Sequence, residues 1–149
     1  MVTYLWFIDN KRIVVVSFII YLLSLTQKCY VQYPSNNDTS VGWALLVLGW
    51  IGLDYHCYVW LANPFLFVSW WFMFRGYFKS SIAMSLISIC LMLSFLSYRL
   101  ILVRVMPDIV YGRIVGYEAG YWLWVASAFV LIVGDLILVV RYYYLVSDK

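Results

Sequence analysis

The sequence predicts an all-α, polytopic membrane protein with four transmembrane helices and one short interfacial or re-entrant helix. Hydrophobic residues make up 66% of the 149 residues and charged residues only 11%, whereas about 25% of a soluble domain is charged. A helix needs about 20 apolar residues to cross a hydrocarbon core of roughly 30 Å. The chain therefore has room for four or five crossings with short connections, and we expect a single membrane domain over residues 1–149.

The first span is predicted over residues 13–31. Lys11 and Arg12 precede an apolar stretch that ends at Thr26, which is short for a crossing unless the Lys28 side chain snorkels to the interface. This start resembles a signal peptide, but no small-x-small cleavage site follows it. We expect the segment to stay attached as a helix.

A hydrophilic loop over residues 32–40 is followed by an almost unbroken apolar stretch over residues 41–74. At 1.5 Å per residue one helix of that length would reach about 51 Å, which exceeds one bilayer. The polar residues at 54–57 and the Asn63-Pro64 pair are the interruptions. We therefore predict a short helix over residues 41–53, on or dipping into the outer leaflet, and a second span over residues 58–74.

The third span is predicted over residues 80–98, after a tight basic turn that contains Arg75 and Lys79. Residues 99–118 mix apolar pairs with charges, which is typical of an interfacial segment. The fourth span is predicted over residues 121–140, ending at Arg141.

The distribution of basic residues predicts that both termini are cytoplasmic, because Lys and Arg are enriched on the cytoplasmic side of short loops. With four crossings, six basic residues fall inside and four outside. The inner residues are Lys11, Arg12, Arg75, Lys79, Arg141 and Lys149, and the outer ones are Lys28, Arg99, Arg104 and Arg113.

Asp135 is the one acidic residue well inside a predicted span, and an ionisable residue at that depth is a functional-site hypothesis. Helical geometry places it within about 60° of a stripe formed by Gly120, Ser127 and Gly134, which we interpret as a helix-packing surface. The alternative, which the sequence favours, is a structural bridge from Asp135 to Arg75 or Lys79 at the cytoplasmic edge.

Asp54, His56 and Cys57, with Asn63 nearby, form the most polar cluster within apolar sequence. A metal or proton-relay site could use them. A single histidine with one carboxylate two residues away is a weak ligand set, and polar residues are expected where a helix breaks near the interface. The preferred interpretation is a solvated elbow.

The predicted topology places Cys29 and Cys57 on the outer side, where an oxidising compartment permits a disulfide between them. Cys90 lies within the third predicted span and should stay reduced. The three cysteines show no CxxC spacing, so no zinc or iron–sulfur site is predicted, and no sequence motif indicates a cofactor.

Two segments carry a resemblance to known proteins. The sequence WLANP over residues 60–64 and the sequence GYWLWVAS over residues 120–127 resemble those of an uncharacterised group of short bacterial polytopic membrane proteins. The resemblance implies a bacterial inner membrane, and it transfers no functional residue.

Two classes of function remain open. No phosphate-binding loop, HExxH, GxSxG or catalytic carboxylate pair is found, so an enzyme is not predicted, and the scattered basic residues do not suggest nucleic acid as a partner. The first hypothesis is an interaction protein in the lipid bilayer, either an immunity protein that binds a membrane-active toxin or an accessory subunit of a membrane complex. The alternative is a small transporter or channel that uses Asp135 or the Asp54/His56 pair.

Overall fold

The structure is a computed structural model that describes residues 9–33, 40–104 and 110–147. Within these residues the chain is mostly helical, as predicted. The α-helices are α1 (Asn10–Thr26), α2 (Gly42–Leu48), α3 (Ala62–Phe74), α4 (Phe78–Ser94) and α5 (Ala119–Ser147). The 3₁₀ helices are η2 (Gly49–Tyr55), η3 (Tyr58–Leu61) and η4 (Phe95–Ser97), and the strands are β1 (Tyr30–Tyr33), β2 (Leu100–Arg104) and β3 (Val110–Tyr117).

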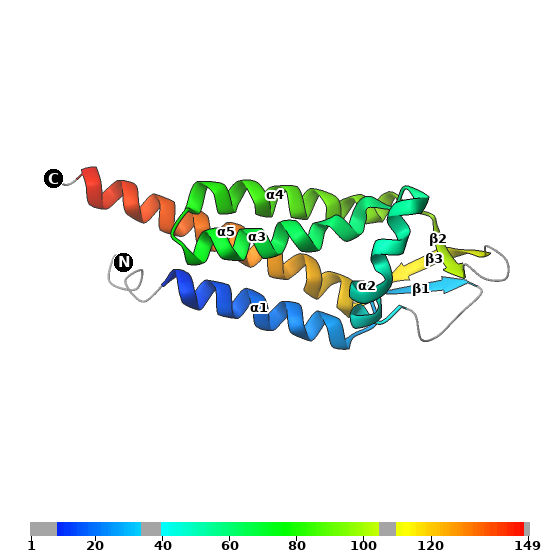
Figure 1. The fold of residues 1–149 in the computed structure, drawn as a ribbon. Helices are drawn as coiled ribbons and strands as arrows, with labels where there is room; N and C mark the ends of the chain where they lie inside the picture. Colours follow the sequence, from blue (N-terminus) through cyan, green and yellow to red (C-terminus); the bar gives the residue numbers. More distant parts are fainter. Residues whose placement is uncertain (1–8, 34–39, 105–109, 148–149) are drawn as a thin grey trace.

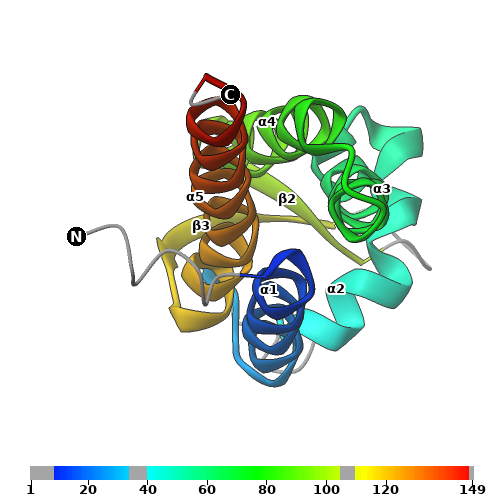
Figure 2. The ribbon, with the colours of Figure 1, turned by 90° about the vertical axis from the view of Figure 1, so that its left-hand side faces the viewer.

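The helices α1, α3, α4 and α5 lie lengthwise in one bundle (Figures 1 and 2). Both ends of the chain lie at one end of this bundle, together with the α3–α4 turn, and the strands lie at the opposite end. We call these the termini end and the sheet end. In the α3–α4 turn Gly76 has a φ of +81°, a conformation that glycine adopts without steric cost.

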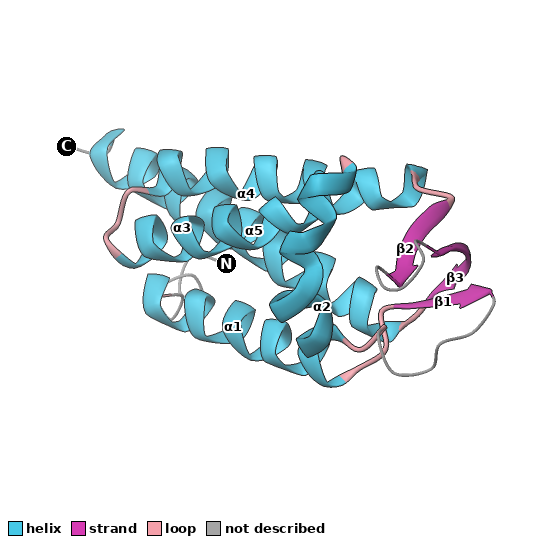
Figure 3. Cartoon of the chain, turned by 45° about the vertical axis from the view of Figure 1, so that its right-hand side comes forward, coloured by secondary structure: helices cyan, strands magenta, loops and turns pink. Residues whose placement is uncertain are grey.

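A three-stranded antiparallel sheet with the order β1-β3-β2 closes the sheet end (Figure 3). It corrects two predictions: the described part of the supposed interfacial segment 99–118 forms β2 and β3, and the first helix ends at Thr26 instead of reaching Val31. Burial alternates along β1, with Tyr30 and Gln32 inside, which is the two-residue period of a strand. Most of the predicted loop over residues 32–40 lies outside the described residues.

The break predicted after the short helix is confirmed. Figure 1 shows α2 and η2 running across the bundle axis, and the chain turns at His56, whose φ is +63°. Trp60 covers this crossing segment, because its Nε1 donates to the Leu46 carbonyl oxygen at 2.8 Å. Gly49 leaves space for the Trp60 ring, since a Cβ there would lie 2.6 Å from the Trp60 Cδ1.

Burial along α4 is the reverse of that in a helix of a water-soluble protein. In α4 the buried residues are Ser81, Ser85, Ser88 and Met92, while large apolar side chains such as Leu86 and Ile87 are exposed. A helix that packs in water places its apolar stripe toward the core and its polar face outward. The outer surface of α4 is therefore suited to an apolar environment.

Among the described residues, two helical segments are long and apolar enough to cross a membrane, Phe78–Ser97 and Ala119–Tyr143. In the most apolar 18-residue stretch of each, 28% and 33% of the residues are buried, so neither resembles the enclosed core helix of a soluble protein. They correspond to the third and fourth predicted spans. The last helix was predicted too short, because α5 continues past Arg141 to Ser147.

Candidate functional site

The interior of the bundle contains a row of buried polar side chains. Each is at most 6% exposed, and most are serines, whose small volume lets helix backbones approach closely. They come from all four lengthwise helices. We call this set the polar row: Ser17, Asn63, Ser69, Ser81, Ser85, Ser88, Ser127 and Asp135.

Asp135 is completely buried in α5, and neither of its carboxyl oxygens has a hydrogen-bond partner. The preceding residue, Gly134, brings this part of α5 against α1 and α3, since a Cβ there would lie 2.5 Å from Ile13 Cγ2 and 3.1 Å from Met73 Cε. The Ser81 side chain lies near the carboxyl group. Asp135 is thus a buried acid beside the Ser81 hydroxyl, in a part of α5 that packs against apolar side chains.

The sequence favoured a structural bridge from Asp135 to Arg75 or Lys79. That prediction is wrong, because the structure does not form this bridge. Arg75 is exposed, and its guanidinium lies 5.5 Å from the centre of the Trp71 ring. Lys79 is also exposed, and neither side chain bonds to Asp135, whose carboxyl oxygens have no hydrogen-bond partner. The packing stripe beside Asp135 is confirmed, because Gly120 lies against the Lys28 carbonyl oxygen and Gly134 against Ile13.

Ser81, which lies near Asp135, belongs to a hydrogen-bonded group of three serines of the polar row. The Ser81 hydroxyl donates to the Ser69 carbonyl oxygen at 3.1 Å, and the Ser69 hydroxyl lies 3.1 Å from Ser81 Oγ and 2.5 Å from Ser85 Oγ. Each hydroxyl has one hydrogen to donate and two lone pairs. A rotation of the Ser81 hydroxyl toward Asp135 would therefore exchange one acceptor for another without leaving the hydrogen unpaired.

The polar row continues toward the sheet end through Ser88 and Asn63. Ser88 donates to the Ala62 carbonyl oxygen at 2.8 Å. The Asn63 side-chain oxygen accepts from the Tyr21 hydroxyl at 3.3 Å and from Trp124 Nε1 at 3.0 Å, and so joins α1, α3 and α5. Asn63 was predicted as part of the elbow, but it belongs to the bundle interior.

A second connection crosses the bundle between α1, α3 and α5. Trp70 Nε1 donates to Ser17 Oγ at 2.8 Å, and the Ser17 hydroxyl donates to the Ser127 carbonyl oxygen at 2.7 Å. The side chains of Trp70, Ser17 and Ser127 each have a hydrogen-bond partner, in contrast to that of Asp135.

The structure places Asp54 near the end of η2 and His56 in the turn that follows it. Asp54 and His56 are both exposed, and the His56 carbonyl oxygen accepts from the Tyr98 hydroxyl at 3.1 Å. In the described part of the chain, no three His, Cys, Asp or Glu side chains gather as metal ligands. The geometry agrees with the elbow interpretation and separates Asp54 and His56 from Asp135.

Cys29 and Cys57 both contribute to a small cluster around Tyr30 and Phe95 at the sheet end. Both are free thiols in the structure, and their disulfide stays a prediction. Burial, aided by the negative charge of Glu118, raises the pKa of the Cys29 thiol to about 12. Burial also raises the pKa of Cys57.

The sequence analysis missed the serines of the polar row. A signal was available, because Ser81, Ser85 and Ser88 follow the i, i+4, i+7 spacing of one helix face. Their bonds to Ser69 and to the Ala62 carbonyl group could not be read from that spacing.

No family model, no curated protein and no solved structure matches this chain. The resemblance of the segments at residues 60–64 and 120–127 to short bacterial membrane proteins therefore stays a prediction.

Proposed function

We propose that the chain is an integral membrane protein of four spans with both termini cytoplasmic, and that it transports protons with Asp135 as the protonatable group. Of the two function classes that the sequence left open, this is the transporter or channel. The observation that carries it is the buried Asp135 carboxyl group without a hydrogen-bond partner.

The arrangement of the bundle supports four crossings. Two of its helical segments are long enough to span by themselves, and α1 and α3 run lengthwise beside them (Figure 1). The α3–α4 turn, with Arg75 and Lys79 beside it, is at the same end as both termini, which fits the enrichment of basic residues on the cytoplasmic side. In this orientation the sheet faces outward and α2 with η2 lies at the outer interface.

An unpaired carboxylate inside a bilayer is costly, and such residues typically mark ion pathways or proton relays. Because Asp135 is completely buried within a single chain, a basic side chain of a partner helix has no access to it in this conformation. A proton is small enough to neutralise the group without a cavity. Ser81 is the fourth residue of α4. Because Asp135 lies near Ser81, it is about one helical turn from the α3–α4 turn.

The polar row supplies the rest of the path. The hydroxyl groups of Ser81, Ser69 and Ser85 can accept and donate hydrogens in turn. Beyond Ser88 the next groups are the Ala62 carbonyl and the Asn63 amide, which do not exchange protons readily. Transport past this point therefore requires α3 and α4 to separate and admit water, as in a gated carrier.

The test is proton flux into liposomes that contain the purified full-length protein. A potassium gradient with valinomycin sets the membrane potential, and an enclosed pH-sensitive dye reports the flux. We expect flux above that of empty liposomes, a loss of most of it in Asp135→Asn, and a smaller loss in Ser81→Ala.

Three variants serve as controls. Asp54→Asn and His56→Gln alter the exposed elbow, and Ser94→Ala removes a hydroxyl that bonds within its own helix to the Leu91 carbonyl oxygen. All three should retain the parent flux. Equal flux in Asp135→Asn and the parent, or no flux above empty liposomes, would exclude Asp135 from transport.

The second candidate is the interaction protein, either an immunity protein or an accessory subunit. The sheet favours it, because the order β1-β3-β2 makes β1 and β2 edge strands, and an edge strand can pair with a strand of another protein. Deletion of the gene followed by challenge with a toxin encoded beside it tests immunity. Unchanged survival would exclude that role.

A further inference from the structure

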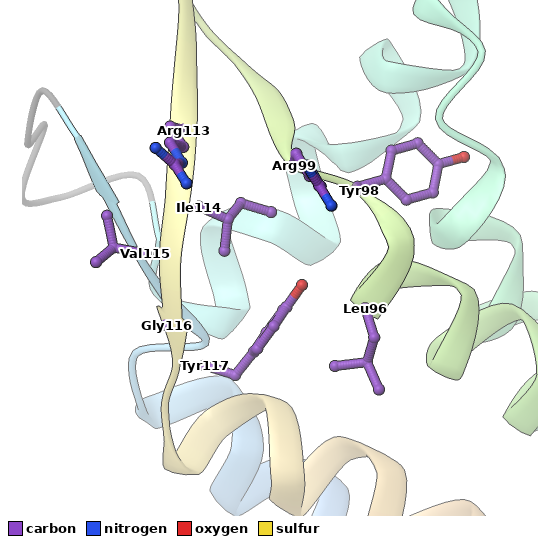
Figure 4. Close-up of a pocket in the computed structure, with 8 residues that line it drawn as sticks. All are labelled: Leu96, Tyr98, Arg99, Arg113, Ile114, Val115, Gly116 and Tyr117. Carbon is purple, nitrogen blue, oxygen red and sulfur yellow. The ribbon is translucent and has the colours of Figure 1, made fainter.

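A hollow of about 430 Å³ opens at the sheet end, between β3 and the segment that joins η4 to β2. Figure 4 shows Arg113 on β3 and Arg99 before β2, with the Tyr117 ring between the two segments. The backbones of the two arginine segments are held together, because the Ile114 amide donates to the Arg99 carbonyl oxygen at 3.0 Å. Arg99 and Arg113 therefore lie on neighbouring backbone segments that border one opening.

Within the part of the chain that the structure describes, neither arginine guanidinium has a protein partner. Both side chains are exposed, and among the described residues no hydrogen bond, ion pair or ring contact engages either guanidinium. The tyrosines of the wall are already committed: Tyr117 donates its hydroxyl to the Phe95 carbonyl oxygen and Tyr98 to that of His56. Among the described side chains that line the hollow, the two guanidinium groups are therefore the donors left for a ligand.

We infer that this hollow binds the phosphate group of an anionic membrane lipid. A guanidinium presents a planar fork of donors that matches phosphate oxygens in a bidentate manner. Because two guanidinium groups carry two positive charges, they favour a lipid with a net negative charge over one without. The inference rests on the membrane placement proposed above. It does not depend on proton transport, because its measurement is lipid retention.

The position of the hollow favours a lipid over a phosphate ion in solution. It lies at the end of the bundle, where the helices α4 and α5 meet the sheet. Exposed aromatic side chains occur at this end, including Trp43 in α2 and Trp122 near the start of α5. Such rings settle at the level of lipid headgroups. Leu96, which lines the hollow beside Arg99, offers an apolar wall on which an acyl chain can lie.

The test is native mass spectrometry of the full-length protein, purified in detergent and mixed with either phosphatidylglycerol or phosphatidylcholine. The parent should retain the anionic lipid preferentially. The double variant Arg99→Gln/Arg113→Gln should lose this preference by about tenfold for each arginine removed, as expected for a charge-assisted hydrogen bond.

Two further variants make the result specific. Lys28→Gln removes one positive charge at the same end, from a side chain outside the hollow, and should retain the parent preference. Arg99→Lys/Arg113→Lys keeps both charges but removes the forks, and should fall between the parent and the glutamine pair. Circular dichroism of each variant confirms that the fold is kept.

Equal losses in Lys28→Gln and the arginine variants would show a diffuse charge effect and overturn the site. Equal retention of the two lipids by the parent would also overturn it. If millimolar inorganic phosphate displaced the anionic lipid from the parent, the site would be one for free phosphate, and the lipid assignment would be wrong.

Discussion

Substitution of Gly120 tests how closely the start of α5 packs against the residues that follow α1. Gly120 is the second residue of α5, and a Cβ at this position would lie 2.7 Å from the Lys28 carbonyl oxygen and 2.9 Å from that of Gln27. A carbon and a carbonyl oxygen normally approach to about 3.3 Å. Gly120→Ala must therefore displace α5 from the end of α1 by about half an ångström, against backbone atoms that have little freedom to move.

The cost follows from two terms. Forcing an extra methyl group into close packing costs about 1–3 kcal/mol. The shift also strains the hydrogen bond from the Gly120 amide to the Lys28 carbonyl oxygen, now 2.9 Å, which contributes about 1 kcal/mol. The higher helix propensity of alanine offsets about 0.5–1 kcal/mol. The net loss of unfolding free energy is about 1–3 kcal/mol, or roughly 2–12 °C in Tm for a chain of this size.

Thermal unfolding in a fixed detergent, followed by circular dichroism, measures the effect. Gly116→Ala is the matched control, because a Cβ at Gly116 in β3 meets nothing within 4 Å, and its Tm should change little. An unchanged or higher Tm in Gly120→Ala would refute the close approach of α5 to the end of α1.

Three further predictions concern single side chains. Trp70→Phe removes the 2.8 Å bond to Ser17 Oγ inside the bundle and should lower the unfolding free energy by about 1–3 kcal/mol; an unchanged Tm would contradict the bond. His56→Gly should raise Tm slightly, because the φ of +63° suits glycine better than histidine, and a lower Tm would argue against that turn. Since the pKa of Cys29 is raised to about 12 by burial and then by Glu118, its thiolate is much rarer at pH 8 than that of an ordinary thiol. Alkylation of Cys29 followed by mass spectrometry should be correspondingly slow at pH 8 and accelerate as pH rises toward 12, whereas labelling at the rate of an exposed thiol would show that the site is open.

Local patterns in the sequence were sufficient to locate the helices and the breaks between them, but not the ends of the first and last helices. The apolar stretches that became α4 and α5, the turn after Arg75 and the elbow at His56 are all visible in the order of residues. Each depends on interactions within a few positions, on side-chain hydrophobicity and on backbone preference. The same patterns identified Asp135 as an unusual acid and its stripe with Gly134 as a packing surface.

The sheet could not be predicted from those patterns. β1 pairs with β3, and Tyr30 lies opposite Tyr117, across more than eighty residues of chain. Residues 28–31 looked like the end of a helix because they follow an apolar stretch directly. These residues instead include the start of β1, because pairing with β3 gives hydrogen-bond partners to their backbone N–H and C=O groups.

By itself the sequence determined that the chain is mainly helical, that two of its helices are apolar enough to cross a membrane, and that one acid lies within an apolar helix. Only the tertiary structure decided that the Asp135 carboxyl oxygens have no hydrogen-bond partner, that Ser69, Ser81 and Ser85 are joined by hydrogen bonds, and that Arg99 and Arg113 share one hollow. The physical reason is one of range. Hydrophobicity and helix formation act between neighbouring residues, whereas a buried site is made by side chains from separate helices and strands, whose meeting depends on how the whole bundle packs.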